Sequence, residues 1–300
     1  METAVRTSVP VDLLRTLAPF RHGAYDPAHQ VVDGVVWRAT LLDTGPATLR
    51  LCQLDADLVH VSAWGPGADE ALAAAPGLLG EHDDVSSFDP PAGLVRQAYR
   101  RFAAVRIGRT GRVLESLVPA VLEQRVITRT AHEAWRWLLR SHGTPAPGPA
   151  PLGMHVPPSA RTWAQIPSWD FHRAGVDPRR ARTVVAAAAV ARRLEEAARM
   201  PGPEALLRLQ AVPGVGPWTA AETTQRALGD ADAVAVGDYH LPGQIGWALT
   251  GQKVDDAGML ALLAPYRPHR HRVVRHLLLS GATRVPRRGP RVTVEDHRRR

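Results

Sequence analysis

Apolar, largely β-branched residues fill three short segments between residues 31 and 64: GVVWRATLL, GPATLRLCQL and DLVHVSAW. Asp-Thr-Gly-Pro and Asp-Ala-Asp, which are typical of turns, separate these segments. The pattern therefore predicts a group of strands near the N-terminus. Residues 67–80 then have the composition of a short helix.

The pattern changes to helical spacing after residues 83–93, a polar, proline-containing stretch that we interpret as a domain boundary. Apolar residues then recur three to four positions apart, which predicts amphipathic helices. This spacing is found over residues 92–107, 112–126, 130–143, 177–200 and 203–212. Residues 144–151, TPAPGPAP, are expected to form an exposed linker.

These segments predict an α+β protein. Its parts would be an N-terminal β-rich domain over residues 1–88, a helical domain over residues 89–285 and a basic tail over residues 286–300. No apolar run approaches the roughly 18 residues that a membrane span needs. The first residues lack the apolar core of a secretory signal, so we expect a cytoplasmic, nucleoid-associated protein without a membrane partner.

The charge of the chain favours a nucleic-acid partner. The formal net charge is +8, and all but one of the 37 basic residues are arginine, the exception being Lys253. Arginine contacts phosphate through two parallel hydrogen bonds and stacks on bases. The codon bias of a GC-rich genome explains much of the arginine excess, but it explains the net charge less well.

Cys52 is the only cysteine of the chain. Intramolecular disulfides, thiolate zinc sites and a cysteine-ligated iron–sulfur cluster are therefore excluded. Cys52 lies in LRLCQLD, beside alternating apolar residues, and is expected to fill core space rather than act as a nucleophile.

A glycine-rich corner joins two predicted helices in the most informative stretch of the sequence. A helix over residues 204–212 leads into PGVGP, and a second helix begins near Trp218. Gly214 and Gly216 allow close approach of the main chain, and the free N–H groups of the second helix favour a phosphate. Alone, the motif is equally typical of an ordinary helix–turn–helix corner.

Asp238 follows an apolar extended run, 22 residues after Gly216. An aspartate in such a place either caps a helix or takes part in chemistry. Because Leu241 and Pro242 come next, the capping role stays open beside the chemical one.

The hairpin LQAVPGVGPWTA, followed at this spacing by VGDYHL, resembles the helix-hairpin-helix DNA glycosylases, especially the DNA-3-methyladenine glycosylase II type. LVPAVLEQRVITRTAHEAW and DPRRARTVVAAA resemble the helices that precede the hairpin, and PYRPHRHRVVRHLL resembles the last helix. The resemblance covers roughly residues 94–282. It implies an all-helical helix-hairpin-helix glycosylase bundle after the β-rich domain, and a monomer that binds double-stranded DNA containing a damaged base.

The resemblance assigns the catalytic aspartate to Asp238, whose carboxylate would stabilise the positive charge that develops on the sugar. Trp218 occupies the position of the Schiff-base lysine in lyase-competent relatives. With Lys253 distant in sequence, this implies a monofunctional glycosylase that uses water. Trp218 and Glu222 would belong to the base pocket, and Leu278 would replace an aromatic residue there.

The resemblance also implies which residues contact DNA. Gln124 and Arg125 match the loop that enters the duplex when a base leaves the stack. The hairpin contacts would come from Gly214, Val215, Gly216 and Thr219. We expect no cofactor and no metal site, although a monovalent cation at the hairpin is compatible with the family.

Three histidines near the C-terminus lie among arginines, which would repel a metal cation. We therefore interpret His269, His271 and His276 as part of a DNA-facing basic helix. Asp230 and Asp232 are expected to form a turn.

The sequence leaves two alternatives open. One is the same fold with a different specificity, for uracil, hypoxanthine or a bulky alkyl adduct. The other is a non-catalytic hairpin protein that only binds DNA, and such a protein would have no reason to keep a carboxylate near the hairpin.

Overall fold

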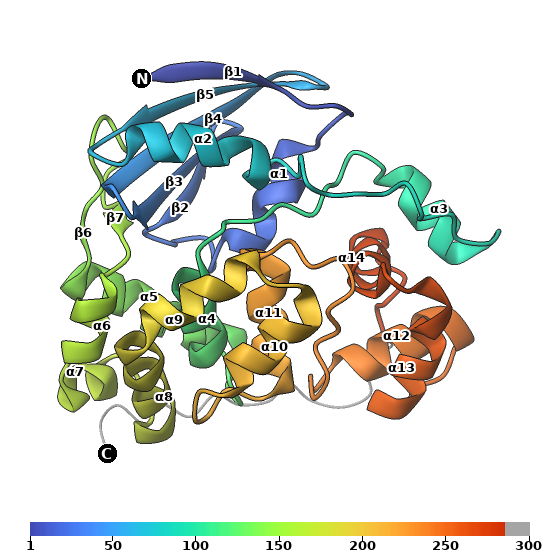
Figure 1. Cartoon of the computed structure of the whole chain (residues 1–300). Coiled ribbons are helices and arrows are strands. Elements are labelled where there is room, and N and C mark those ends of the chain that lie inside the picture. The colour runs from blue at the N-terminus through green and yellow to red at the C-terminus, as the bar shows by residue number, and fades with distance from the viewer. Residues whose placement is uncertain (286–300) are drawn as a thin grey trace.

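The computed structural model describes residues 1–285, and its N-terminal part is an antiparallel sheet with the order β1-β5-β4-β3-β2 (Figure 1). The strands are β1 (Glu2–Arg6), β2 (His29–Val32), β3 (Val35–Leu42), β4 (Gly45–Asp55) and β5 (Leu58–Trp64). The three predicted strand segments correspond to β3, β4 and β5, whereas β1 and β2 were not predicted individually.

Local turn chemistry fixes the register of this sheet. Asp33 and Gly34 both have positive φ angles, 50° and 78°, and form the two-residue connection between β2 and β3. Such turns match the twist of paired strands, and Val32 accordingly pairs with Val35. The inward-facing side chains of the sheet pack under α1 (Leu13–Leu17) and α2 (Ala68–Leu78) in a core that ends at Leu79.

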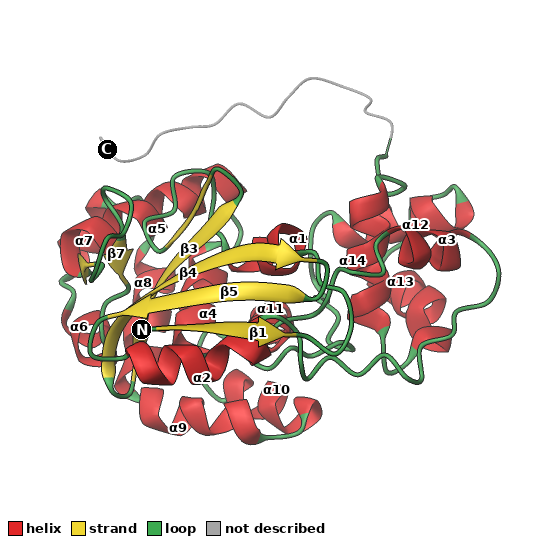
Figure 2. Ribbon diagram, turned by 90° about the horizontal axis from the view of Figure 1, so that it is seen from above, coloured by secondary structure: helices red, strands yellow, loops and turns green. Residues whose placement is uncertain are grey.

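The rest of the described chain is mainly helical and has two cores. The first lies between α4 (Val113–Leu122), α5 (Thr128–His142), α6 (Ala160–Gln165), α7 (Ser168–Arg173), α8 (Pro178–Ala189), α9 (Ala191–Glu195) and α10 (Gly202–Gln210). The second lies between α3 (Leu94–Arg101), α12 (Leu241–Thr250), α13 (Asp256–Leu263) and α14 (Arg270–Ser280). These four helices group at one end of the molecule (Figure 2).

The helix α11 (Pro217–Ala227) contributes to both cores. Ala220 and Ala227 pack in the first, and Ala221 packs in the second. Small side chains on several faces of α11 allow both groups of helices to approach it closely. The first turn of α11 therefore lies between the two lobes, in the centre of Figure 1.

The N-terminal segment also reaches the helical part. The Arg226 Nε donates to the Pro19 carbonyl at 2.9 Å, and Arg275 donates to the Arg15 carbonyl at 2.5 Å. Phe88 belongs to the second helical core, so packing changes partners between Leu79 and Phe88. The boundary at residue 88 remains an interpretation, and the predicted basic tail, residues 286–300, lies outside the described residues.

Two expectations about local structure need correction. Residues 144–151 are not a free linker, because β6 (Thr144–Pro145) pairs with β7 (His155–Val156) and this hairpin packs on the outer face of β3. The predicted long helix over residues 177–200 is divided into α8, α9 and a short 3-10 turn, with a break at Val190. Of the helices in residues 1–285, none has both the length and the apolar character that crossing a membrane would require.

Candidate active site and DNA interface

The hairpin between α10 and α11 has a conformation that depends on Gly214. Gly214 is exposed, with φ at +92°, and a Cβ there would lie 2.1 Å from the Thr183 Oγ1. Gly216 differs, since its φ is −97° and nothing lies within 4 Å of the position of a Cβ. The fold thus requires glycine at Gly214, whereas Gly216 keeps the outer surface of the hairpin free of side chains.

The first turn of α11 follows directly on this hairpin, and its N–H groups have no partners within the helix. A helix N-terminus of this kind favours a phosphate. The side chains of Val215 and Thr219 are buried, and the Val215 N–H already donates to the Val212 carbonyl at 3.0 Å. Neither side chain can therefore reach DNA in this conformation.

Gln124 joins the turn between α4 and α5 to the hairpin. Its Nε2 donates to the Gly214 carbonyl at 3.0 Å and to the Thr219 Oγ1 at 2.8 Å. The next residue, Arg125, is exposed and has φ at +54°, a left-handed conformation that side chains rarely adopt. Gln124 is thus held in place, and Arg125 is the residue that the turn presents to the outside.

Asp238 lies at the start of α12, where its carboxylate has three N–H donors. Oδ1 accepts from the main-chain N–H of His240 at 2.7 Å and of Leu241 at 2.8 Å, and Oδ2 accepts from the Trp218 indole at 3.2 Å. Asp238 therefore does cap the N-terminus of α12. The same bonds fix the carboxylate beside the first turn of α11, so the two roles coexist.

A cavity of about 350 Å³ opens next to this carboxylate. Asp238, Glu222 and Leu278 line it, as the sequence implied for the pocket, and Phe20 of the N-terminal segment forms part of another wall. The half-buried Trp218 is not among the lining residues, because its ring packs against the second helical core. Trp218 thus positions Asp238 rather than forming a wall of this cavity.

An ion pair compensates the acidic residue of the pocket. Glu222 Oε2 lies 2.7 Å from the Arg226 Nη1, and both side chains are mostly buried. Burial alone would lower the pKa of Arg226, but Glu222 and Glu123 raise it above its usual range. The Glu222 carboxylate is therefore already paired and does not give the pocket an uncompensated negative charge.

The opposite wall comes from α14 and carries basic groups. Burial and the neighbouring Arg226 lower the pKa of Arg275 to about 10. Burial, Arg275 and Arg226 hold the pKa of His271 well below its usual range, so this imidazole is neutral at pH 7. The cavity therefore combines apolar walls with a neutral imidazole, a compensated ion pair and the Asp238 carboxylate.

The other basic residues of α14 are not on a DNA-facing surface, which corrects the interpretation from the sequence. His269, Arg272 and His276 are all buried. The Arg272 guanidinium pairs with the buried Asp83, so its charge is used to join α14 to the segment before α3. Asp230 does form the expected turn, accepting from the N–H groups of Asp232 and Ala233.

Lys253 lies nearer to this region than its sequence position indicates. Its side chain is exposed, and its stem lies 3.6–4.0 Å from where a Cβ on Gly243 would be, in the first turns of α12. Lys253 nevertheless does not line the cavity beside Asp238.

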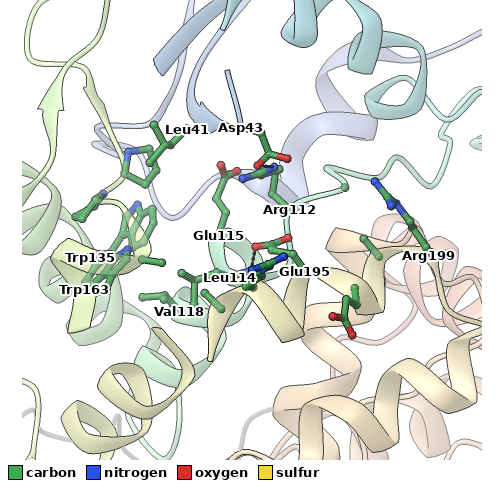
Figure 3. A pocket seen from close by; sticks show the side chains of 18 residues that line it. Leu41, Asp43, Arg112, Leu114, Glu115, Val118, Trp135, Trp163, Glu195 and Arg199 are labelled. Atoms are coloured by element: carbon green, nitrogen blue, oxygen red, sulfur yellow. Dashed lines mark hydrogen bonds and ion pairs between the residues drawn. The ribbon is translucent and has the colours of Figure 1, made fainter. Parts of the chain in front are cut away.

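A larger cavity of about 480 Å³ lies between β3, α4, α6 and α9 (Figure 3). Trp135 and Trp163 stand on one side of it, and its carboxylates are used in the fold. Glu195 accepts the Val113 and Leu114 N–H groups at the start of α4, and Glu115 bonds to Arg38 and Thr40. Neither Asp238 nor the hairpin lines this cavity, so the smaller cavity is the better candidate active site.

Sequence reasoning missed Phe20, Gln225 and Gln244 as lining residues of the smaller cavity. Gln225 and Gln244 lie on helices whose pocket-facing side the periodicity alone did not indicate. Phe20 reaches the cavity only because the N-terminal segment packs on α11 and α14, a contact between parts of the chain some 200 residues apart.

Comparison with known proteins agrees with this geometry. The chain is 32% identical over 174 residues to a probable bifunctional transcriptional activator/DNA repair enzyme, AlkA, of Mycobacterium tuberculosis. The match covers 57% of this chain and 34% of that protein, so it spans about a third of the length of the curated relative. No protein-family model matches the chain.

Solved structures resemble this one over almost its whole length. A 3-methyladenine DNA glycosylase of Archaeoglobus fulgidus superposes with a TM-score of 0.74 at 17% identity, covering 92% of this chain and 97% of its own. An 8-oxoguanine glycosylase/lyase of Clostridium acetobutylicum gives a TM-score of 0.70 at 13% identity, covering 92% and 95%. A 3-methyladenine DNA glycosylase of Schizosaccharomyces pombe, in complex with abasic DNA, gives 0.53 at 16% identity, covering 65% and 96%.

These likenesses show the fold. The expected α+β architecture, with a β-rich N-terminal part followed by a helix-hairpin-helix bundle, is confirmed.

Proposed function

We propose that this chain, which has the fold of the helix-hairpin-helix DNA glycosylases, is a DNA glycosylase that releases a damaged base from double-stranded DNA. The observation that carries the proposal is the position of Asp238. Its carboxylate lines a cavity of about 350 Å³ and is tied through Trp218 to the turn that follows the glycine hairpin. A protein that only bound DNA would have no use for this arrangement.

The proposed chemistry is hydrolysis of the bond between C1′ of the sugar and the base nitrogen. As this bond breaks, the bond electrons leave with the base and positive charge develops on the sugar. The Asp238 carboxylate, held in a fixed place by three N–H donors, stabilises that charge. A water molecule then forms the new bond to C1′ and releases its proton to Asp238 or to solvent.

DNA would reach this site through the hairpin and the turn after α4. The N–H groups at the start of α11 face a phosphate, which positions the duplex without reading its sequence. Arg125 would fill the gap in the base stack when the damaged base enters the cavity. The proposed enzyme acts as a monomer and needs no cofactor for hydrolysis.

The damaged base is proposed to be alkylated, in the manner of 3-methyladenine. Such a base is already cationic, so it leaves as a neutral molecule and needs little acid catalysis. The cavity supports this assignment through its lack of a strong general acid near Asp238 and through the apolar surfaces of Phe20 and Leu278. Uracil, hypoxanthine and bulky adducts are the competing substrates.

The reaction is proposed to stop at the abasic site. A lyase needs a primary amine at C1′, and no lysine lines the cavity. Trp218 stands at the start of α11 and cannot form an imine. Lys253, whose stem packs near Gly243, is the one lysine that a test must include.

The experiment is an excision assay on duplexes that each carry one damaged base, analysed with and without alkali and with borohydride. We expect release of methylated bases, strand breaks only after alkali, and no covalent adduct. A trapped adduct that is lost in Lys253→Ala would overturn the water mechanism. Release of uracil or hypoxanthine alone would overturn the alkylated-base assignment, and no release from any duplex would overturn the glycosylase itself.

A further inference from the structure

Three side chains far apart in the sequence converge at the base of the turn between α4 and α5. His22 belongs to the N-terminal segment, Glu123 ends α4, and His132 lies on α5. The His22 Nδ1 lies 3.8 Å from Glu123 Oε1, and the His132 Nε2 lies 3.7 Å from the same oxygen. One ligand atom from each of the three residues lies within 4.8 Å of the other two.

These separations are too long for hydrogen bonds but close to those around a metal ion. A hydrogen bond to nitrogen needs about 2.7–3.2 Å. Around a tetrahedral ion with metal–nitrogen distances of about 2.0–2.1 Å, neighbouring ligand atoms are roughly 3.3–3.4 Å apart. Small rotations of half-buried side chains would close the remaining few tenths of an ångström for Glu123 and each of its two histidine neighbours.

The surroundings favour a cation at this point. The pKa of Glu123 lies far below its usual range: burial opposes ionisation, but His132 and His22 more than offset it. The buried Asp26 carboxylate adjoins His22, whose N–H it accepts at 2.6 Å. The positive Arg226 is near Glu123 but is paired with Glu222. Negative groups therefore outnumber positive ones around the cluster.

We propose that His22, Glu123 and His132 bind a divalent transition-metal ion, Zn²⁺ in the first instance. Two imidazole nitrogens and one carboxylate suit Zn²⁺, whereas Mg²⁺ and Ca²⁺ prefer all-oxygen sites. A water molecule would supply the fourth ligand. The expectation of no metal site came from the sequence, in which residues 22, 123 and 132 form no recognisable spacing motif.

The ion would act as a brace rather than as a catalyst. It would join the N-terminal segment, the end of α4 and the start of α5, which are the supports of the turn that presents Arg125. Any effect on DNA rests on the proposed function, but metal binding itself does not. The site can therefore be tested on the protein without DNA.

The test uses the full chain, stripped of metal with a chelator and then titrated with Zn²⁺ by calorimetry and with Co²⁺ by visible spectroscopy. The variants are His132→Ala and the isosteric Glu123→Gln, and the matched control is His172→Ala, which removes an exposed histidine from α7. Circular dichroism confirms that each metal-free variant is folded, and Glu123→Gln decides if His132→Ala is not.

We expect one Zn²⁺ per chain in the wild type and the control, a tetrahedral Co²⁺ spectrum, and a rise in Tm with Zn²⁺. Affinity should fall at least about tenfold in either cluster variant. Absence of stoichiometric binding to the wild type would overturn the proposal. Equal binding by Glu123→Gln and His172→Ala would also overturn it, since the metal would then be held elsewhere.

Discussion

The indole N–H of Trp218 donates to the Asp238 carboxylate across 3.2 Å and thereby ties the first turn of α11 to the start of α12. The hairpin that would hold the DNA backbone and the carboxylate that would act on the sugar are thus fixed relative to each other. This contact makes Trp218 a positioning residue. Its position at the start of α11, beside Asp238, is also where an amine would have to stand for lyase chemistry.

The two hairpin glycines should respond differently to substitution. Gly214→Ala should destabilise the fold, because φ is +92° and the new Cβ would meet Thr183. We expect a loss of about 1–3 kcal/mol in the free energy of unfolding. Gly216→Ala has open space and should unfold like the wild type.

Gly216→Ala should nevertheless bind all duplexes more weakly and to a similar degree, since the contact is to phosphate. Urea unfolding and binding titrations with intact and damaged duplexes measure both effects. Normal binding of intact duplex by Gly216→Ala, with loss confined to damaged duplex, would mean that the hairpin reads bases.

Replacement of Arg125 should have opposite effects on stability and on activity. Arg125→Gly relieves the left-handed conformation at φ +54° and should raise the unfolding free energy by roughly 1 kcal/mol. Both Arg125→Gly and Arg125→Ala should lower base excision, because neither can fill the gap in the stack. Full excision by Arg125→Ala would remove this residue from the proposed wedge role.

Glu222→Gln should change the preference of the pocket for the charge of the base. Without Glu222, the Arg226 guanidinium loses its partner and the cavity becomes more positive. Excision of cationic bases such as 3-methyladenine should then fall relative to neutral hypoxanthine by roughly tenfold, equivalent to about 1.4 kcal/mol. Glu204→Gln, at an exposed glutamate on α10, is the control. An unchanged ratio would show that Glu222 does not influence the bound base.

Acid should destabilise the fold through His276. Burial and the nearby Arg272 and Arg275 lower its pKa to about 4. The unfolded chain takes up this proton near pH 6.5 but the native protein does not, so stability is full above that pH and is lost as the pH falls toward 4. At pH 5 this one group should cost about 2 kcal/mol relative to pH 7.5.

Urea unfolding of the wild type and of His276→Gln at pH 7.5 and pH 5 measures this contribution. The variant should lose less stability on acidification than the wild type. The exposed His172→Gln should behave like the wild type. An equal loss in wild type and His276→Gln would contradict the assignment.

Local sequence signals were sufficient for the elements that are stabilised by local chemistry. The apolar segments of β3, β4 and β5 and the glycine corner before α11 are visible in the sequence, and so is Asp238 with its capping role. The burial of Arg272 and His276 was not, because charged residues with helical spacing usually face solvent. Their partner Asp83 lies 189 positions away from Arg272.

The pocket shows the same division. Residues within the resembling motif, Glu222 and Leu278, were placed from the sequence and do line the cavity. Phe20 could not be placed, because its approach depends on how the N-terminal segment packs against Arg226. Periodicity reports which face of an element is buried but not which distant element covers it.

Base release from methylated duplex DNA by the wild type and by Asp238→Asn tests the central claim most directly. The control is Asp256→Asn, which removes the same charge from a nearby carboxylate that bonds to Gly237 and does not line the cavity. We expect Asp238→Asn to fold and bind DNA but to lose ~10²–10³-fold in the excision rate, since it lacks the charge that acts in the transition state. Asp256→Asn should keep its rate. Excision at nearly the wild-type rate by a folded Asp238→Asn would contradict the account.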